Sequence, residues 1–233
     1  MSGSARVATA STPRFVLILI GVGGFLDAYT YLTRGGVFAN TQTGNVILLA
    51  TSGAAGEWHR AVAHLWSILA FVVGVLVATV LRTWWRDATS AALLVSVTSA
   101  QALVLGVVAA VPAEWPNVVV TVPIAFVAAM QMELFRTIGG MPIITIATTG
   151  NLMRFVESVH ALLTQRDAES RRRCALYSAV VAAFAGGAVV GAIVSRWLGT
   201  PAVAVCAVAM IVVALFVVHD ARQIDADAPE PEG

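Results

Sequence analysis

The chain has no lysine and few charges of either sign. All fourteen basic residues are arginine, charged residues make up 12% of the 233 residues, and hydrophobic residues make up 58%. Soluble domains are about one quarter charged and less than half apolar. This composition therefore excludes an ordinary water-soluble domain, and a formal net charge of +1 gives no reason to expect nucleic acid as a partner.

Motifs for catalysis and for cofactor binding are missing as well. The two cysteines, Cys174 and Cys206, are too few for a disulfide framework or a zinc site, and the four histidines lack metal-ligand spacing. The sequence contains no Gly-x-Ser-x-Gly, His-Glu-x-x-His or phosphate-binding motif. We therefore expect neither an enzyme nor an ATP-driven pump, and we expect no metal or other cofactor.

Long apolar runs dominate what the sequence does contain. The hydrocarbon core of a bilayer is about 30 Å thick and requires about 20 apolar residues of helix. Helices satisfy their own backbone hydrogen bonds, and the runs lack the alternation of β-barrel strands. The composition thus predicts an all-α membrane protein with six transmembrane helices. The six apolar windows are residues 15–33, 64–81, 91–111, 118–135, 175–194 and 201–218.

The positions of the arginines predict the orientation in the membrane. Short cytoplasmic loops are enriched in arginine. With six spans and a cytoplasmic N-terminus, eleven arginines lie on the inner side and only Arg34, Arg60 and Arg196 lie on the outer side. This asymmetry predicts that both termini are cytoplasmic and that the protein resides in a bacterial inner membrane. The inner arginines are Arg6, Arg14, Arg82, Arg86, Arg136, Arg154, Arg166, Arg171, Arg172, Arg173 and Arg222.

An internal repeat is visible when the chain is aligned on itself. An offset of 106 residues superposes two Thr-Gly-Asn triplets, and an offset of 113 superposes small residues in the second and fifth windows. We interpret these small residues as helix packing positions. Two blocks in the same order favour a duplication. The aligned pairs include Asp27 with Glu133, residues 43–45 with 149–151, Gly74 with Gly187, and Ala78 with Gly191.

The duplication predicts two repeats of three spans each, residues 15–111 and 118–218. An odd number of spans places the two repeats in the membrane with opposite orientation, which is a recurring plan of secondary transporters. Residues 1–14 are then a cytoplasmic N-terminal segment, and residues 219–233 are a disordered cytoplasmic tail.

Each repeat holds one further apolar segment, residues 37–53 and 141–163. If both segments were full spans, the arginine asymmetry would become weaker and Arg154 would lie within a span. We therefore expect re-entrant half-helices, each preceded by an extended stretch at residues 36–38 or 143–146. Thr43 or Asn45 would cap the first half-helix, and Thr149 or Asn151 would cap the second.

The block GFLDAYTYLTRGGVFANTQTGNVILLA, residues 24–50, resembles the hallmark block of the YoaK-like family of bacterial membrane proteins, a domain of unknown function. The resemblance extends to ATTGNLMR at residues 147–154 and to the spacing of the later spans. It implies the fold and a membrane location but no substrate. An extended stretch leading into a half-helix in each repeat is also similar to the core domains of sulfate and nucleobase transporters, as an analogy.

The polar residues inside these segments form the candidate site. An intramembrane carboxylate costs roughly 2.5 to 3.5 kcal/mol on insertion scales and generally faces a partner or a cavity. Asp27 and Glu133 either bind a coupling proton or cation, or lie near the interface and pair with Arg34 or Arg136. The candidate residues are Asp27, Asn40, Gln42, Thr43, Gly44, Asn45, Gln131, Glu133, Thr149, Gly150 and Asn151.

The two half-helix N-termini suggest the chemistry of the solute. Each would direct unpaired N–H groups and a positive dipole end at whatever occupies the cavity. The alternative is that Gly44 and Gly150 only permit tight turns that threonine and asparagine cap. We predict a transporter or channel for a small polar or anionic solute that can be coupled to protons, and a chain that can form a homodimer in the lipid bilayer. The alternative is a non-transporting scaffold for lipids or protein partners.

Overall fold

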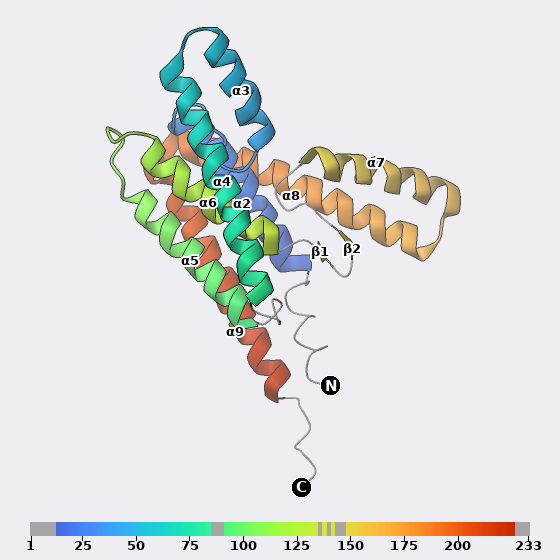
Figure 1. Cartoon of the computed structure of the whole chain (residues 1–233). Helices are drawn as coiled ribbons and strands as arrows, with labels where there is room; N and C mark the ends of the chain where they lie inside the picture. The colour runs from blue at the N-terminus through green and yellow to red at the C-terminus, as the bar shows by residue number, and fades with distance from the viewer. Residues whose placement is uncertain (1–12, 85–90, 135–136, 139–140, 143–147, 227–233) are drawn as a thin grey trace.

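A computed structural model describes residues 13–84, 91–134, 137–138, 141–142 and 148–226 (Figure 1). The regular secondary structure of this part of the chain is helical except for one antiparallel hairpin, β1 (Thr137–Ile138) and β2 (Met141–Pro142). The helices are α2 (Pro13–Thr33), α3 (Gln42–Ala54), α4 (Trp58–Trp84), α5 (Ala91–Ala109), α6 (Val118–Leu134), α7 (Thr148–Gln165), α8 (Ala168–Leu198), the 3-10 helix η1 (Thr200–Val203) and α9 (Ala204–Ala226).

Each of the six predicted windows falls on a helix. Four described helices are long and apolar enough to cross a membrane, namely α2, α4, α8 and the stretch Thr200–His219. The other two, Val95–Ala109 and Val118–Leu134, are apolar but shorter. Among the described residues α9 continues to Ala226, so the predicted disorder of the tail is wrong for residues 219–226. Residues 227–233 lie outside the described part of the chain.

The helices bury small and polar side chains and expose large apolar ones. In α4, His64 and Ser67 are buried, whereas Leu69, Val73 and Leu76 are between 43% and 61% exposed. Helices of water-soluble proteins show the opposite pattern. An extended apolar surface of this kind is typical of a contact with lipid or with another protein, so the structure has the surface of a membrane protein.

The two helices outside the six windows follow the same pattern. α3 buries Asn45 and Ser52, and α7 buries Asn151 and Ser158, which lie 106 residues further along the chain. At 13 residues, α3 is about 20 Å long and too short to cross a bilayer core. Both helices therefore combine a polar inner face with an apolar outer face. The exposed apolar side chains beside the two asparagines are Val46, Ile47, Leu152 and Met153.

The tightest contacts join helices from opposite halves of the chain. α2 packs along α8, α4 along α6, and α5 along α9. α3 packs on α4, and α7 packs on α8. Figure 1 shows the resulting α3–α4 hairpin at the top of the molecule and the α7–α8 hairpin extending to the right. The two halves are therefore interlocked rather than separate domains.

Glycines allow the two central helix pairs to approach closely. A Cβ added to Gly187 of α8 would lie 1.9 Å from the carbonyl oxygen of Gly21 in α2. A Cβ added to Gly74 of α4 would lie 2.5 Å from the carbonyl oxygen of Phe126 in α6. Real Cβ atoms essentially never approach other atoms below 3.0 Å. The predicted packing role of Gly74 and Gly187 is thus confirmed.

We expect Gly187→Ala to destabilise the protein, because the added methyl group would overlap Gly21 and push α2 and α8 apart. Overpacking of this kind costs about 1–3 kcal/mol, so the melting temperature in detergent micelles should fall by several degrees. Gly186→Ala is the matched control, since a Cβ on Gly186 meets nothing within 4 Å. Equal melting temperatures for the two variants would contradict the close contact between α2 and α8.

Candidate functional site

The connection between α2 and α3, residues 34–41, runs back along α2 instead of away from it. Gly35 and Gly36 reverse the chain with φ values of 80° and 78°, which residues with a Cβ rarely adopt. At the end of the connection, the Asn40 Nδ2 donates a hydrogen bond to the Gly23 carbonyl oxygen at 2.8 Å. Gly23 lies ten residues before the end of α2, or about 15 Å along the helix.

Asp27 of α2 holds the N-terminus of α3. Its side chain is buried, and its carboxylate accepts hydrogen bonds from the Asn40 N–H at 2.8 Å, from the Thr41 N–H at 3.3 Å and from the Thr41 hydroxyl. Thr41 is the N-cap residue of α3. The N–H groups at the start of a helix carry the positive end of its dipole and favour an anion. Asp27 therefore occupies the position that the sequence suggested for an anionic solute.

Asn45 ties α3 to the α2–α3 connection and to α4. Its Oδ1 accepts from the Phe38 N–H at 3.0 Å, and its Nδ2 donates to the Phe38 carbonyl oxygen at 2.7 Å. The same amide lies 3.2 Å from the Ser67 Oγ and 3.2 Å from the His64 Nδ1. One buried side chain thus satisfies both backbone groups of Phe38 in the α2–α3 connection.

The remaining candidates of this turn have smaller roles. Gln42 donates to the Ala39 carbonyl oxygen at 3.0 Å, and Thr43 is exposed. A Cβ on Gly44 would lie 2.8 Å from the Phe38 ring, so glycine allows the ring to pack against the helix. The prediction that Thr43 or Asn45 caps α3 is wrong. The helix already begins at Gln42, and its N-cap residue is Thr41, whose N–H and hydroxyl bind Asp27 of α2.

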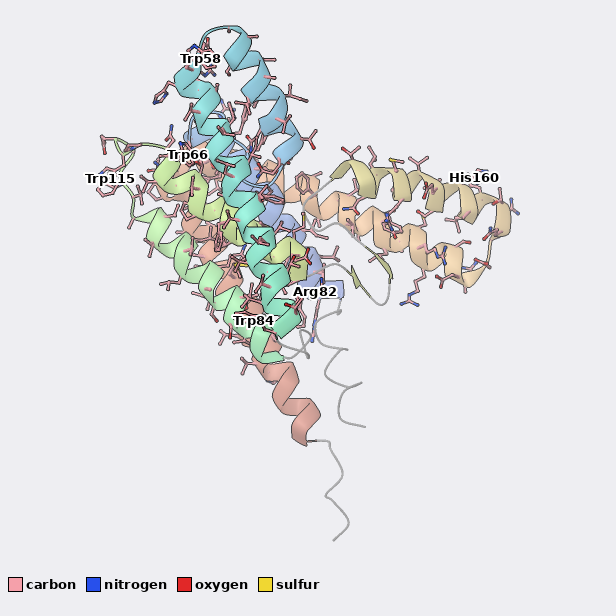
Figure 2. All side chains as sticks on the ribbon, in the orientation of Figure 1. Trp58, Trp66, Arg82, Trp84, Trp115 and His160 are labelled. Atoms are coloured by element: carbon pink, nitrogen blue, oxygen red, sulfur yellow. The ribbon has the colours of Figure 1, made fainter. Side chains whose placement is uncertain are left out.

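Glu133, aligned with Asp27 in the repeat, lies in a different environment. Its Oε1 is 2.8 Å from the Nη1 of Arg82 on α4, and its side chain is 5% exposed whereas that of Arg82 is 42% exposed. Arg136, the predicted partner, lies outside the described residues. Figure 2 shows Arg82 beside Trp84, at the end of α4 opposite to Trp58. Because tryptophans mark membrane interfaces, Glu133 sits near one end of its helix pair.

The second Thr-Gly-Asn turn is described from Thr148 onwards, where α7 begins. Thr149 and Asn151 are thus inside the helix and do not cap it, which corrects the prediction. Asn151 is buried, Thr149 is exposed, and Gly150 is partly exposed. The preceding extended stretch predicted at residues 143–146 lies outside the described residues. On the same helix, the Arg154 Nη1 donates to the Tyr177 hydroxyl at 3.4 Å, so the two turns have different chemistry.

Three polar residues of the site were missed from the sequence, namely Thr41, His64 and Ser67. His64 and Ser67 are three residues apart and share one face of α4, a signal that could have indicated a polar contact with the turn. Of the other candidates, Gln131 donates between helices to the Leu19 carbonyl oxygen at 3.3 Å. Within the described residues, no cluster of histidine, cysteine or carboxylate side chains could hold a metal ion.

Comparison with known proteins identifies a family but no activity. Residues 15–216 match the family described as protein of unknown function (DUF1275), and the chain belongs to this family. No curated protein and no solved structure matches the chain. The narrower YoaK-like label stays a prediction. Because the family description names no activity, the function has to be argued from the site itself.

We expect Asn45→Ala to lower the melting temperature, because it removes the partner of the Phe38 N–H and leaves the Phe38 carbonyl oxygen with the Ser67 hydroxyl as its donor. Each buried polar group left without a partner costs about 1–3 kcal/mol. Thr43→Ala, in the same turn but exposed, is the matched control and should change stability by less than about 0.5 kcal/mol. Thermal unfolding in detergent compares the two variants, and a larger loss for Thr43→Ala would refute the assigned role of Asn45.

Proposed function

We propose that this member of the DUF1275 family is a multi-pass inner-membrane transporter or channel for a small polar or anionic solute, and that it performs no catalysis. The observation that carries the proposal is the N-terminus of α3, which lies inside the protein and is bound by Asp27. Irregular backbone within a membrane is tolerated where it is buried in protein or lines a cavity. Helices that begin at mid-depth form the solute sites of many secondary transporters.

Six spans are supported by the directions of the packed helices. α4 and α6 run parallel, because Gly74 faces Phe126 and, further along both helices, Arg82 pairs with Glu133. A parallel pair requires an odd number of crossings between its members. α5 supplies this single crossing between α4 and α6.

A re-entrant α3 and a common side for both termini are supported by contacts at the helix ends. Arg34, after the end of α2, and Trp58, at the start of α4, line the same pocket. The chain therefore returns through α3 to the side from which the connection descended. Phe15 near the start of α2 contacts Phe216 of α9, with ring centroids 6.1 Å apart. This contact supports a common side for the two ends of the described chain, and the arginine asymmetry supports the cytoplasm as that side.

An inverted repeat is supported by the pairing of the helices. In an inverted repeat, α2 corresponds to α6, α3 to α7, α4 to α8 and α5 to α9. The contact of α2 with α8 is then equivalent to the contact of α6 with α4. Likewise, α3 on α4 is equivalent to α7 on α8, and α5 meets its own equivalent, α9. A two-fold axis generates reciprocal contacts of this kind. With three spans in each repeat, such an axis lies in the membrane plane.

Asp27 is the proposed coupling group. Its ionised carboxylate binds the N–H groups that an anionic solute would need, so carboxylate and solute compete for the same helix end. Protonation neutralises Asp27 and weakens its attraction to the helix dipole, which frees these donors for the solute. Anion and proton would then bind together and leave together, and no covalent bond of the solute changes.

Glu133 and Arg82 are the proposed gate. Their ion pair joins the ends of α4 and α6, on the side that the arginines assign to the cytoplasm. Because Arg82 is partly exposed, the pair can exchange its contact for water at modest cost. Opening of this pair would separate the two helices at the inner end.

A non-transporting scaffold is the second candidate, and one observation favours it. The polar turn is filled by side chains of the protein, with Asp27 at the helix end and Asn45 on the connection. If these bonds never open, the turn is purely structural. Transport and scaffold make opposite predictions for a variant that removes the charge of Asp27 but keeps its shape.

The test uses liposomes that contain purified protein and the pH-sensitive dye pyranine. Inward gradients of chloride, phosphate, sulfate and malonate are applied in turn. For a transported anion, the wild type should acidify the interior, because a proton enters with each anion. Asp27→Asn should fold, since its amide oxygen still accepts from Asn40, but should abolish the acidification because it cannot bind a proton.

Two further variants separate gating from coupling. Glu133→Gln and Arg82→Gln should each keep the proton-coupled signal and raise the leak, because either change breaks the same ion pair. Arg196→Gln, an exposed arginine outside both features, is the control. Unchanged acidification in Asp27→Asn would exclude Asp27 as the coupling group, and the absence of any protein-dependent signal would favour the scaffold.

A further inference from the structure

A second polar feature lies next to the α3 site. A pocket of about 660 Å³ opens where the α2–α3 connection meets the starts of α4 and α6. Small-molecule sites have volumes of this order. Its lining includes Arg34, Arg60, Trp58 and Trp66, and no described carboxylate lines it. Figure 2 shows Trp58 and Trp66 with Trp115 at this end of the molecule.

Arg34 is the unusual residue of this pocket. Its side chain is fully buried, its Nε donates to the Tyr29 hydroxyl at 3.2 Å, and its Nη2 donates to the Val111 carbonyl oxygen at 3.2 Å. Its Nη1 is buried and has no hydrogen-bond partner. No described carboxylate pairs with it, since Asp27, its predicted partner, binds the start of α3 instead. A buried guanidinium without a counter-charge is costly.

The rest of the lining indicates the shape of the missing partner. With Nε and Nη2 already bonded, Arg34 has its Nη1 left for a carboxylate or phosphate oxygen, and the tryptophans add apolar faces to the lining. Arg60 contributes less, because it is exposed and already pairs with Glu57 at 2.8 Å. The pocket thus combines one desolvated positive charge with apolar walls.

We infer that this pocket binds an organic anion, with its charged oxygens at Arg34 and its apolar body against Trp58 and Trp66. The inference rests on the proposed function in one respect, namely that the bound anion is the solute waiting at the outer entrance to α3. The anion can come from the water as an organic acid or from the bilayer as an anionic lipid headgroup.

The test measures binding without transport. Protein in nanodiscs of phosphatidylcholine is titrated with phenylacetate and, separately, with its neutral analogue phenylacetamide, and the melting temperature and tryptophan fluorescence are recorded. Phenylacetate should bind saturably and raise the melting temperature, because it supplies the anion that Arg34 lacks. Phenylacetamide should have no such effect, because it carries no charge.

Three variants locate the site. Arg34→Gln should weaken phenylacetate binding at least tenfold, and Arg196→Gln, an outer arginine away from the pocket, should leave it unchanged. Because Arg34→Gln also alters two structural hydrogen bonds, Val62→Trp gives an independent test. Val62 lines the pocket and is partly exposed, so the larger side chain fills the space, leaves Arg34 intact and should abolish binding.

The lipid arm identifies the source of the anion. Nanodiscs that contain phosphatidylglycerol should weaken phenylacetate binding if a lipid headgroup occupies the pocket, and should leave it unchanged if the ligand comes from the water; either result supports an anion site. Equal binding of phenylacetate to the wild type, Arg34→Gln and Val62→Trp, or no saturable binding at all, would overturn the inference. Phenylacetate binding without any uptake in the pyranine assay would support this anion site and contradict the proposed transport. Uptake without phenylacetate binding would support transport and contradict this site.

Discussion

A helix that begins inside a membrane has to find partners for its first N–H groups within the protein, because lipid offers none. In this chain α3 begins inside the protein, and the carboxylate of Asp27 is the partner of the Thr41 N–H at its N-terminus. The rest of the site follows from this single contact. The α2–α3 connection must run back along α2 to Asp27, glycines must reverse the chain at the end of α2, and Asn45 must bind both backbone groups of Phe38 in the connection.

The surrounding helices enclose this contact by inverting the pattern of a soluble protein. Polar side chains of α3 and α4 face each other, and apolar ones face outward. Glycine at the α2–α8 and α4–α6 contacts brings backbones close enough to exclude lipid from the interior. The two halves use the same pairing of helices but different chemistry. Asp27 binds a helix end, whereas Glu133 binds an arginine near the end of a span.

Apolar length and residue pairs at fixed offsets were enough to predict the helices, the packing glycines and a helix that starts close to the first Thr-Gly-Asn turn. The capping residues could not be predicted, because the N-cap residue Thr41 binds Asp27, a residue brought near by the folded chain rather than by sequence. The contact of Glu133 with Arg82 of α4 was not predicted for the same reason. The sequence placed Arg34 with the arginines of the outer loops and gave no sign that its side chain is buried. Only its burial and its unpaired Nη1 distinguish it.

The central claim is that α3 and α7 enter the membrane from opposite faces as half-helices. Thr43 and Thr149 occupy equivalent positions in the two turns, and both are exposed. In a background in which Cys174 and Cys206 are replaced by alanine, single cysteines at these two positions can be labelled with a membrane-impermeant maleimide in right-side-out and inside-out vesicles. The account predicts that Thr43→Cys reacts only from the periplasmic side and Thr149→Cys only from the cytoplasmic side. Labelling of both positions from the same side would contradict it.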